Sequence, residues 1–233
     1  MRSERGECIP AADLLPVQRR ATFMFRFARA LIWPLMRLVF DYRMVGAENL
    51  PRDRPYVLIC NHLNWIDPWS LLVLWPVEPR VHFLANPENL VKHRVHWAFV
   101  RSVGGYIPVD LKHGGGPTLF HHVDRCLAAG GVVAIFPEAA YGPREGELQP
   151  FKRGFAHFAE DNGVPVVPVT VSGTKELWLR RRIEVRIGTP IEPGAGIEAM
   201  FASARTRMEE QLPLYVDPGG PKPLREFLTH LLY

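Results

Sequence analysis

Six short apolar or β-branched runs alternate with stretches of helical length, and this alternation limits the possible folds more than any other feature of the chain. Such runs are typical of buried strands, and stretches that open with proline are typical of helices. The alternation predicts an α/β fold with a mostly parallel central sheet flanked by helices. The expected strands are Tyr56–Cys60, Val81–Leu84, Tyr106–Val109, Val132–Phe136, Val166–Val171 and Ile183–Ile187, and the expected helices are Pro68–Trp75, Pro87–Val100, Pro117–Ala129 and Phe151–Asn162.

Charge is distributed unevenly along the chain. Lys and Arg exceed Asp and Glu by 28 − 24 = 4 over the 233 residues, and residues 1–40 hold the whole excess. The remainder shows no zinc-finger spacing and no basic run beyond Arg180–Arg182, so nucleic acid is not an expected partner. Arg180–Arg182 itself predicts a loop before a strand, with a contact to anionic lipid as the alternative.

The cysteines indicate neither a disulfide framework nor a metal site. Cys8, Cys60 and Cys126 are odd in number and far apart, without a C-x-x-C pair. This predicts a reduced, intracellular chain. Acidic residues interrupt its beginning, which also argues against a secretory signal.

A basic amphipathic helix is expected at the N-terminus. The segment from Val17 to Phe40 contains five arginines and no acidic residue. On a helix, Arg19, Arg26 and Arg37 fall within about 20° of one another, opposite a broad apolar face.

This helix is too basic to span a bilayer. Its apolar residues contribute about −3 to −5 kcal/mol to insertion, whereas three central arginines cost about 8 to 10 kcal/mol. We therefore expect a peripheral helix lying in the interface of an anionic membrane surface, on its cytoplasmic face, with wet guanidinium groups. The alternative is an ordinary helix packed on the body of the protein, with arginine stems covering apolar surface.

The candidate catalytic pair follows the first expected strand. Ligand crevices of parallel sheets lie beyond the carboxyl ends of the strands, and there His62 is followed five residues later by Asp67. Asp67 before Pro68 is typical of an N-cap and a first helical residue, which makes the turn short. The carboxylate of Asp67 can then hold the Nδ1 proton of His62 and leave Nε2 as a base. The alternative is a helix-capping Asp67 and a His62 that bonds the backbone.

No serine of the chain lies in a G-x-S-x-G elbow, so the sequence offers no nucleophile to complete a triad. A His–Asp pair without an enzyme nucleophile suits a reaction in which the substrate supplies the attacking hydroxyl. Acyl transfer is such a reaction.

Five blocks occur in a characteristic order: Asn61-His62 with Asp67, residues 105–110 (GYIPVD), residues 136–138 (FPE), residues 151–154 (FKRG) and residues 164–169 (VPVVPV). Together they resemble the motif set of the glycerolipid acyltransferases, in particular the 1-acyl-glycerol-3-phosphate acyltransferase family. The resemblance covers roughly residues 45 to 190. Several blocks in the correct order are far more specific than any one of them.

The resemblance implies an O-acyltransferase of phospholipid biosynthesis or remodelling. It would move a fatty acyl group from a co-substrate, acyl-CoA or acyl carrier protein, to the hydroxyl of a lyso-glycerolipid or related membrane lipid. It implies His62 as general base, Asp67 as its orienting partner, and Asn61, Gly105 and Glu138 as substrate-binding residues, with no metal, no bound cofactor and no covalent enzyme intermediate. Backbone N–H groups between residues 61 and 68, or at a helix start, are the expected oxyanion donors.

The chain departs from the family pattern where the acceptor phosphate is expected. After the glutamate of the third block the family usually continues with Gly-Thr-Arg, whereas this chain has Ala139, Ala140 and Tyr141, and Leu111 replaces the arginine that ends the second block. A phosphate acceptor would then need other cations. The nearest in sequence are Arg144, Lys152 and Arg153; otherwise the acceptor is a lysophospholipid, a glycolipid or another long-chain hydroxyl compound.

Three regions are expected along the chain: a membrane-associating segment over residues 1–44, an acyltransferase α/β domain over 45–215 and a helical tail over 216–233. Two alternatives to acyl transfer stay open. One is an acyl-thioester hydrolase, in which the same pair activates water. The other is a non-catalytic peripheral protein that binds membrane lipid.

Overall fold

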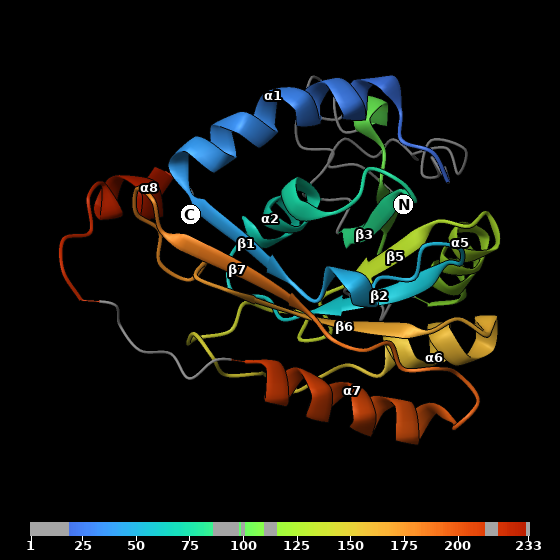
Figure 1. Ribbon diagram of the computed structural model, residues 1–233. Coiled ribbons are helices and arrows are strands. Elements are labelled where there is room, and N and C mark those ends of the chain that lie inside the picture. The colour runs from blue at the N-terminus through green and yellow to red at the C-terminus, as the bar shows by residue number, and fades with distance from the viewer. Residues whose placement is uncertain (1–18, 86–97, 99–100, 110–115, 213–218, 232–233) are drawn as a thin grey trace, which may run out of the picture.

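A seven-stranded sheet between two layers of helices forms the protein (Figure 1). The computed structural model describes residues 19–85, 98, 101–109, 116–212 and 219–231. The strands are β1 (Asp41–Val45), β2 (Tyr56–Cys60), β3 (Val81–Ala85), β4 (Tyr106–Pro108), β5 (Val132–Ile135), β6 (Val166–Ser172) and β7 (Arg182–Ile187), and the helices are α1 (Phe23–Val39), α2 (Asp67–Leu74), α5 (Gly116–Ala128), α6 (Gly154–Asn162), α7 (Ile197–Gln211) and α8 (Arg225–Leu231), with a short 3₁₀ helix η2 (Ala47–Asn49).

The predicted mostly parallel sheet is confirmed. Its strand order is β1-β7-β6-β2-β5-β3-β4, and every pairing is parallel except that of β6 with β7. The carboxyl ends of β2, β5 and β6 therefore meet at one edge of the sheet. The segments that follow these three strands build the site described below.

Two apolar cores lie on opposite faces of the sheet. Along β2, Leu58 and Cys60 face the layer of α1 and α2, whereas Val57 and Ile59 face the layer of α5, α6 and α7. Alternate residues of a strand point to opposite faces, so a strand with helices on both sides is apolar at every position. This is why the central strands appear in the sequence as continuous apolar runs.

The six expected strands match β2 to β7 to within one residue at each end. The expected helix Pro117–Ala129 matches α5, whereas Phe151–Asn162 begins three residues later, at Gly154. The sequence patterns missed β1 and α7. The helix expected over Pro87–Val100 lies almost entirely outside the described residues.

Helix α1 lies on the body with its basic side partly inward. The Arg29 guanidinium donates hydrogen bonds to the carbonyl oxygens of Leu72, Val73 and Trp75, at 3.0, 3.1 and 3.0 Å. The expectation of wet guanidinium groups is therefore wrong for Arg29, because the free carbonyls at the end of α2 attract a cation.

Much of the apolar side of α1 faces outward. Phe25 is its only buried residue, under the guanidinium of Arg80, which lies 3.7 Å from the ring centre. Phe23 is 80% exposed and Leu38 is 69% exposed. Among the described helices, none combines the length and the apolar character needed to cross a membrane.

Candidate active site

The turn between β2 and α2 brings His62 and Asp67 together. Nδ1 of His62 lies 2.8 Å from Oδ2 of Asp67. The carboxylate side chain is 0% exposed and the imidazole 16% exposed, so the ring can be reached from solvent while its partner cannot. An ionised carboxylate only accepts hydrogen bonds, so the neutral ring carries its proton on Nδ1 and leaves Nε2 as an acceptor.

The carboxylate of Asp67 also holds the turn. Oδ2 accepts hydrogen bonds from the backbone N–H groups of Leu63 at 2.6 Å and Asn64 at 2.8 Å. Asp67 was expected as the N-cap of the helix, but it is the first helical residue and Ile66 is the N-cap. The carboxylate turns back toward the preceding loop instead of capping helix N–H groups, and it thereby fixes both the turn and the imidazole.

Most backbone N–H groups of the turn are engaged within the protein. Those of Leu63 and Asn64 bond Asp67, as described above, and those of Ile66 and Asp67 bond the side chain and carbonyl oxygens of Asn64. The N–H of His62 lies 3.5 Å from Oε2 of Glu138. Between residues 62 and 67, the N–H of the partly exposed Trp65 has no acceptor among the described residues.

Two aromatic rings fix the plane of the His62 imidazole. Phe136, directly after β5, stacks on His62 with ring centres 3.9 Å apart and an angle of 15°. Tyr141 meets the same ring edge-on, at 4.5 Å and 70°. His62 is therefore held between the partly buried ring of Phe136 and the exposed phenol of Tyr141, which leaves its ring little freedom to rotate.

Glu138 is the second carboxyl group beside His62. Its side chain is buried, and Oε1 has no hydrogen-bond partner among the described residues. Burial raises the pKa of Glu138 to about 7, and the negative charge of Asp67 acts in the same direction. The N–H groups of His62 and Gln149 and the charge of Arg205 oppose this rise. Glu138 therefore titrates near neutral pH and can exchange a proton there.

Asparagine side chains tie the turn to the end of β6. The amide of Asn61 donates to the carbonyl of Val171 at 3.0 Å and accepts from its N–H at 2.7 Å. The amide of Asn64 donates to the carbonyl of Thr174 at 3.1 Å. Asn61, expected among the substrate-binding residues, is buried in this brace, and Asn64 makes a matching contact that the sequence patterns did not single out.

The three candidate phosphate-binding cations lie apart from the His–Asp pair. Arg144 lies 3.6 Å from Glu147, and Arg153 forms an ion pair with Glu198. Lys152 donates its backbone N–H to Pro137 and has an exposed side chain. In the part of the chain that the structure describes, none of the three side chains contacts the pair.

Gly105, also expected to bind substrate, has a structural reason to be glycine. Its φ is +82°, and a Cβ atom there would lie 2.1 Å from the guanidinium of Arg80. The close approach of Arg80 at the start of β4 leaves no room for a side chain.

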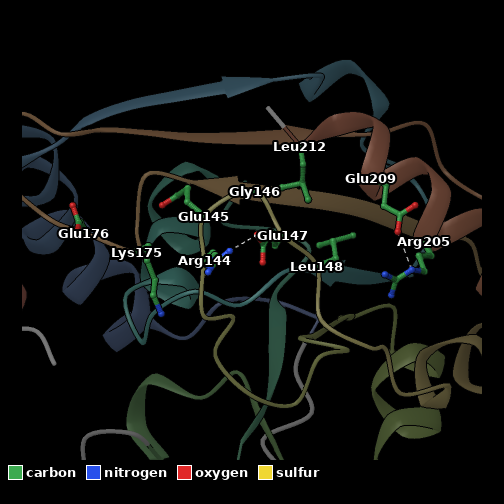
Figure 2. A pocket seen from close by; sticks show the side chains of 10 residues that line it. All are labelled: Arg144, Glu145, Gly146, Glu147, Leu148, Lys175, Glu176, Arg205, Glu209 and Leu212. Carbon is green, nitrogen blue, oxygen red and sulfur yellow. Dashed lines mark ion pairs between the residues drawn. The ribbon is translucent and has the colours of Figure 1, made fainter. Parts of the chain in front are cut away.

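An open pocket of about 920 Å³ lies between residues 144–148, the segment after β6 and the C-terminal half of α7 (Figure 2). Lys175 reaches from the segment after β6 and donates to the carbonyl of Gly142 at 2.7 Å, while the N–H of Gly142 donates to the carbonyl of His62 at 2.6 Å. The pocket includes neither His62 nor Asp67. Its lining alternates in charge and comprises Arg144, Glu145, Gly146, Glu147, Leu148, Lys175, Glu176, Arg205, Glu209 and Leu212.

Within the described ranges, no three His, Cys, Asp or Glu side chains are grouped so that they could hold a metal ion.

Comparison with known sequences places this geometry in a family. The sequence profile of the family described as Acyltransferase matches residues 41–172, more than half of the chain. The chain belongs to the Acyltransferase family. The matched range contains the His62–Asp67 turn, Glu138 and Tyr141, and it ends before Lys175.

Similar proteins carry related names. A 1-acyl-sn-glycerol-3-phosphate acyltransferase of Bacillus subtilis is 29% identical over 172 residues, which are 72% of this chain and 82% of that protein. A chloroplastic 1-acyl-sn-glycerol-3-phosphate acyltransferase of Brassica napus is 32% identical over 154 residues, 64% of this chain and 42% of that protein. The chain thus spans most of the bacterial relative but less than half of the plant one. It is an acyltransferase that resembles this group.

A solved structure shares the fold. The crystal structure of the 1-acyl-sn-glycerophosphate acyltransferase PlsC from Thermotoga maritima matches with a TM-score of 0.62 at 21% identity, over 83% of each chain. The similarity extends beyond the profile match, and it establishes the architecture of the sheet and its flanking helices.

Proposed function

We propose that this acyltransferase moves a fatty acyl group from an acyl thioester, carried by coenzyme A or by acyl carrier protein, to the free hydroxyl of a lyso-glycerolipid. The observation that carries the proposal is the 2.8 Å hydrogen bond between His62 and the fully buried Asp67. The names of the relatives support the acceptor class. The reaction belongs to phospholipid biosynthesis or remodelling.

The reaction needs a base and then an acid, and one imidazole can serve as both. Nε2 of His62 takes the proton of the acceptor hydroxyl while its oxygen attacks the thioester carbonyl. The new C–O bond forms and the C–S bond breaks, and the imidazolium returns the proton to the leaving thiolate. Asp67 stabilises the imidazolium and keeps Nδ1 protonated.

The oxyanion formed during attack needs a hydrogen-bond donor. The N–H groups of the turn that already bond Asn64, Asp67 or Glu138 are unsuited to this task. The N–H of Trp65 stays available, and we assign it as the donor that the turn offers.

The enzyme works at a membrane surface as a peripheral protein. Its acceptor and product carry long acyl chains, and drawing such a chain into water costs about 0.8 kcal/mol for each CH₂ group. The exposed apolar side of α1 supplies a surface that fits the lipid interface. Docking there lets the substrate stay in the bilayer.

A His62→Ala variant tests the mechanism. We expect turnover to fall by at least about 10²-fold without loss of folding, because general-base catalysis contributes on this scale. The assay uses radiolabelled acyl-CoA with a panel of lyso-lipids and separates lipid product from free fatty acid.

Exposed His121 on α5 provides the matched control, and His121→Ala should keep full activity. Near-normal turnover in His62→Ala would remove the mechanism. Free fatty acid as the sole product would identify a hydrolase, and the absence of any product would favour a lipid-binding protein.

A further inference from the structure

A second group of exposed apolar side chains lies beside the C-terminal end of α1. Leu224 is 55% exposed and Phe227 is 59% exposed, and Leu179 is exposed as well. Figure 1 shows α8 next to the end of α1. We call Leu179, Leu224 and Phe227 the α8 patch.

Backbone hydrogen bonds join the α8 patch to α1. The N–H of Leu179 donates to the carbonyl of Pro223 at 2.9 Å, and the N–H of Arg180 donates to the carbonyl of Val39 at 2.6 Å. Residues 38, 179 and 224 therefore belong to segments that are tied to one another. The apolar stripe of α1 continues through Leu38 onto the α8 patch.

The patch is held in place from beneath. Leu228 of α8 is buried in the core that also contains Phe40, so this residue docks α8 on the body while Phe227 is exposed. The backbone of Leu224 adopts φ +59°, a conformation that residues other than glycine seldom take. The exposed side chain of Leu224 is unfavourable in water, and this cost is removed when the side chain enters an apolar phase.

Two arginines lie where α1 meets the α8 patch. The Arg180 guanidinium donates to the carbonyl of Arg37 at 2.9 Å, and the Arg37 guanidinium lies 4.8 Å from the centre of the Trp33 ring. Among the described residues, neither arginine has a carboxylate within ion-pair distance. Apolar side chains beside uncompensated guanidinium groups complement the acyl chains and phosphates of an anionic bilayer.

We propose that the α8 patch and the exposed stripe of α1 form one docking surface for an anionic lipid bilayer. The inference rests on the proposed function, in which α1 contacts the membrane. It adds that the C-terminal helix contacts the same membrane, so the protein is held at two places along one surface.

Co-sedimentation of the full chain with vesicles tests the proposal. The vesicles contain phosphatidylcholine and phosphatidylglycerol in equal amounts, with pure phosphatidylcholine as the second arm. The variant Leu179→Gln/Leu224→Asn/Phe227→Gln removes the patch, and asparagine is chosen because it tolerates a positive φ. We expect at least about a tenfold loss of partitioning, the effect of about 1.4 kcal/mol.

A matched pair of single variants separates the surface from general hydrophobicity. Phe227→Gln should weaken binding several-fold, whereas Phe120→Gln, at an exposed residue of α5 across the sheet, should not change it. Wild-type binding should also be weaker on pure phosphatidylcholine. Unchanged partitioning of the triple variant would overturn the proposal, and so would a wild-type dimer that the triple variant converts to monomers, since the patch would then bind a second copy.

A label keeps the test decisive if the triple variant does not fold. In a Cys8→Ser background, Leu224→Cys carries an environment-sensitive dye, since Cys60 and Cys126 are buried. A blue shift of emission on vesicles is expected, and emission that stays as in water would contradict the proposal. Acyl transfer measured in detergent micelles on the same samples reports separately on the proposed function.

Discussion

Two neighbouring segments of the site, the turn of residues 61–67 and the loop of residues 137–142, differ in how they are built. The turn is rich in internal hydrogen bonds, and Oδ2 of Asp67 alone accepts three of them. The loop has Ala139 at φ +56° and the half-exposed Tyr141 where the resembled family has glycine and arginine. A single strong backbone hydrogen bond, from Gly142 to His62, joins the two segments.

This difference suggests separate roles, with the turn assigned to proton transfer and the loop to recognition of the acceptor. The turn holds the His62–Asp67 pair to which we assign proton transfer, and its own hydrogen bonds and those to the end of β6 order its backbone. The loop holds the aromatic contact to His62 but has lost the family's guanidinium. We infer that the reaction is preserved and that selection of the acceptor has changed, and four variants can break or sharpen this comparison.

The largest effect is expected for Asp67→Asn. It replaces an acceptor of three hydrogen bonds with a neutral amide, so turnover should fall by about 10²-fold or more. The fold should also lose about 1 to 3 kcal/mol, since buried donors lose a charged partner. Steady-state kinetics and urea unfolding measure the two effects. Asp53→Asn, at an exposed position, is the control, and equal behaviour of the two variants would refute the role of the turn.

Glu138→Gln should change the pH dependence of stability. The pKa of buried Glu138 is raised to about 7, so the folded state binds its proton more tightly than the unfolded state, where the pKa is near 4.5. The raised pKa of Glu138 therefore contributes to the free energy of unfolding in full below pH 4.5, and this contribution is lost as the pH rises through 7. We expect the glutamine variant to gain up to about 3 kcal/mol relative to the wild type across this interval. Parallel unfolding curves at all pH values would show that Glu138 is not buried as a carboxyl group.

Tyr141→Arg tests the change of acceptor. The substitution restores the family's residue beside His62, and a charge-assisted bond to a phosphate contributes about 1.5 to 3 kcal/mol. We expect kcat/KM for lysophosphatidate to rise by at least about tenfold. Tyr141→Phe, which keeps the ring contact, should leave the preference among acceptors as it is. A loss of activity on every acceptor in Tyr141→Arg would mean that the phenol serves the imidazole and not recognition.

The smallest effect is expected for Ala139→Gly. Glycine relieves the left-handed strain of about 1 kcal/mol but adds freedom to the unfolded chain, so unfolding free energy should stay within about 0.5 kcal/mol of the wild type. The same change at exposed Ala202 in α7 should cost about 1 kcal/mol. Equal losses at both positions, in urea unfolding, would show that residue 139 is not held in this conformation.

The sheet could be predicted because its central strands β2, β5 and β6 are short and almost entirely buried, so they appear as apolar runs. The sequence patterns missed β1 because Asp41 and Arg43 interrupt its apolar residues, and it is an edge strand paired only with β7. They also missed α7, whose buried positions are few: Met200, Ala204 and Met208. A narrow apolar stripe is enough to dock α7, because α5 and α6 already cover much of the same face of the sheet.

The geometry of His62 and Asp67 could be anticipated because five residues of chain and a helix start limit where the two side chains can lie. Contacts between residues far apart in the sequence could not be anticipated. Nothing in the spacing of residues 62 and 141 shows that the two rings meet, and the periodicity of α1 gives its faces without showing which one turns toward the body. The partners of Arg29 and Arg153 depend on which carbonyl and carboxylate groups the tertiary fold brings near them.

The contact of Arg29 with the end of α2 has a consequence for orientation. Asp67 is the first residue of α2, and the helix has eight residues, a length of about 12 Å. The Arg29 guanidinium of α1 contacts the C-terminal end of this helix, and Asp67 lies at the opposite end. In the membrane-bound state proposed above, the tilt of α1 therefore also sets the height and direction of the His62 imidazole above the lipid headgroups.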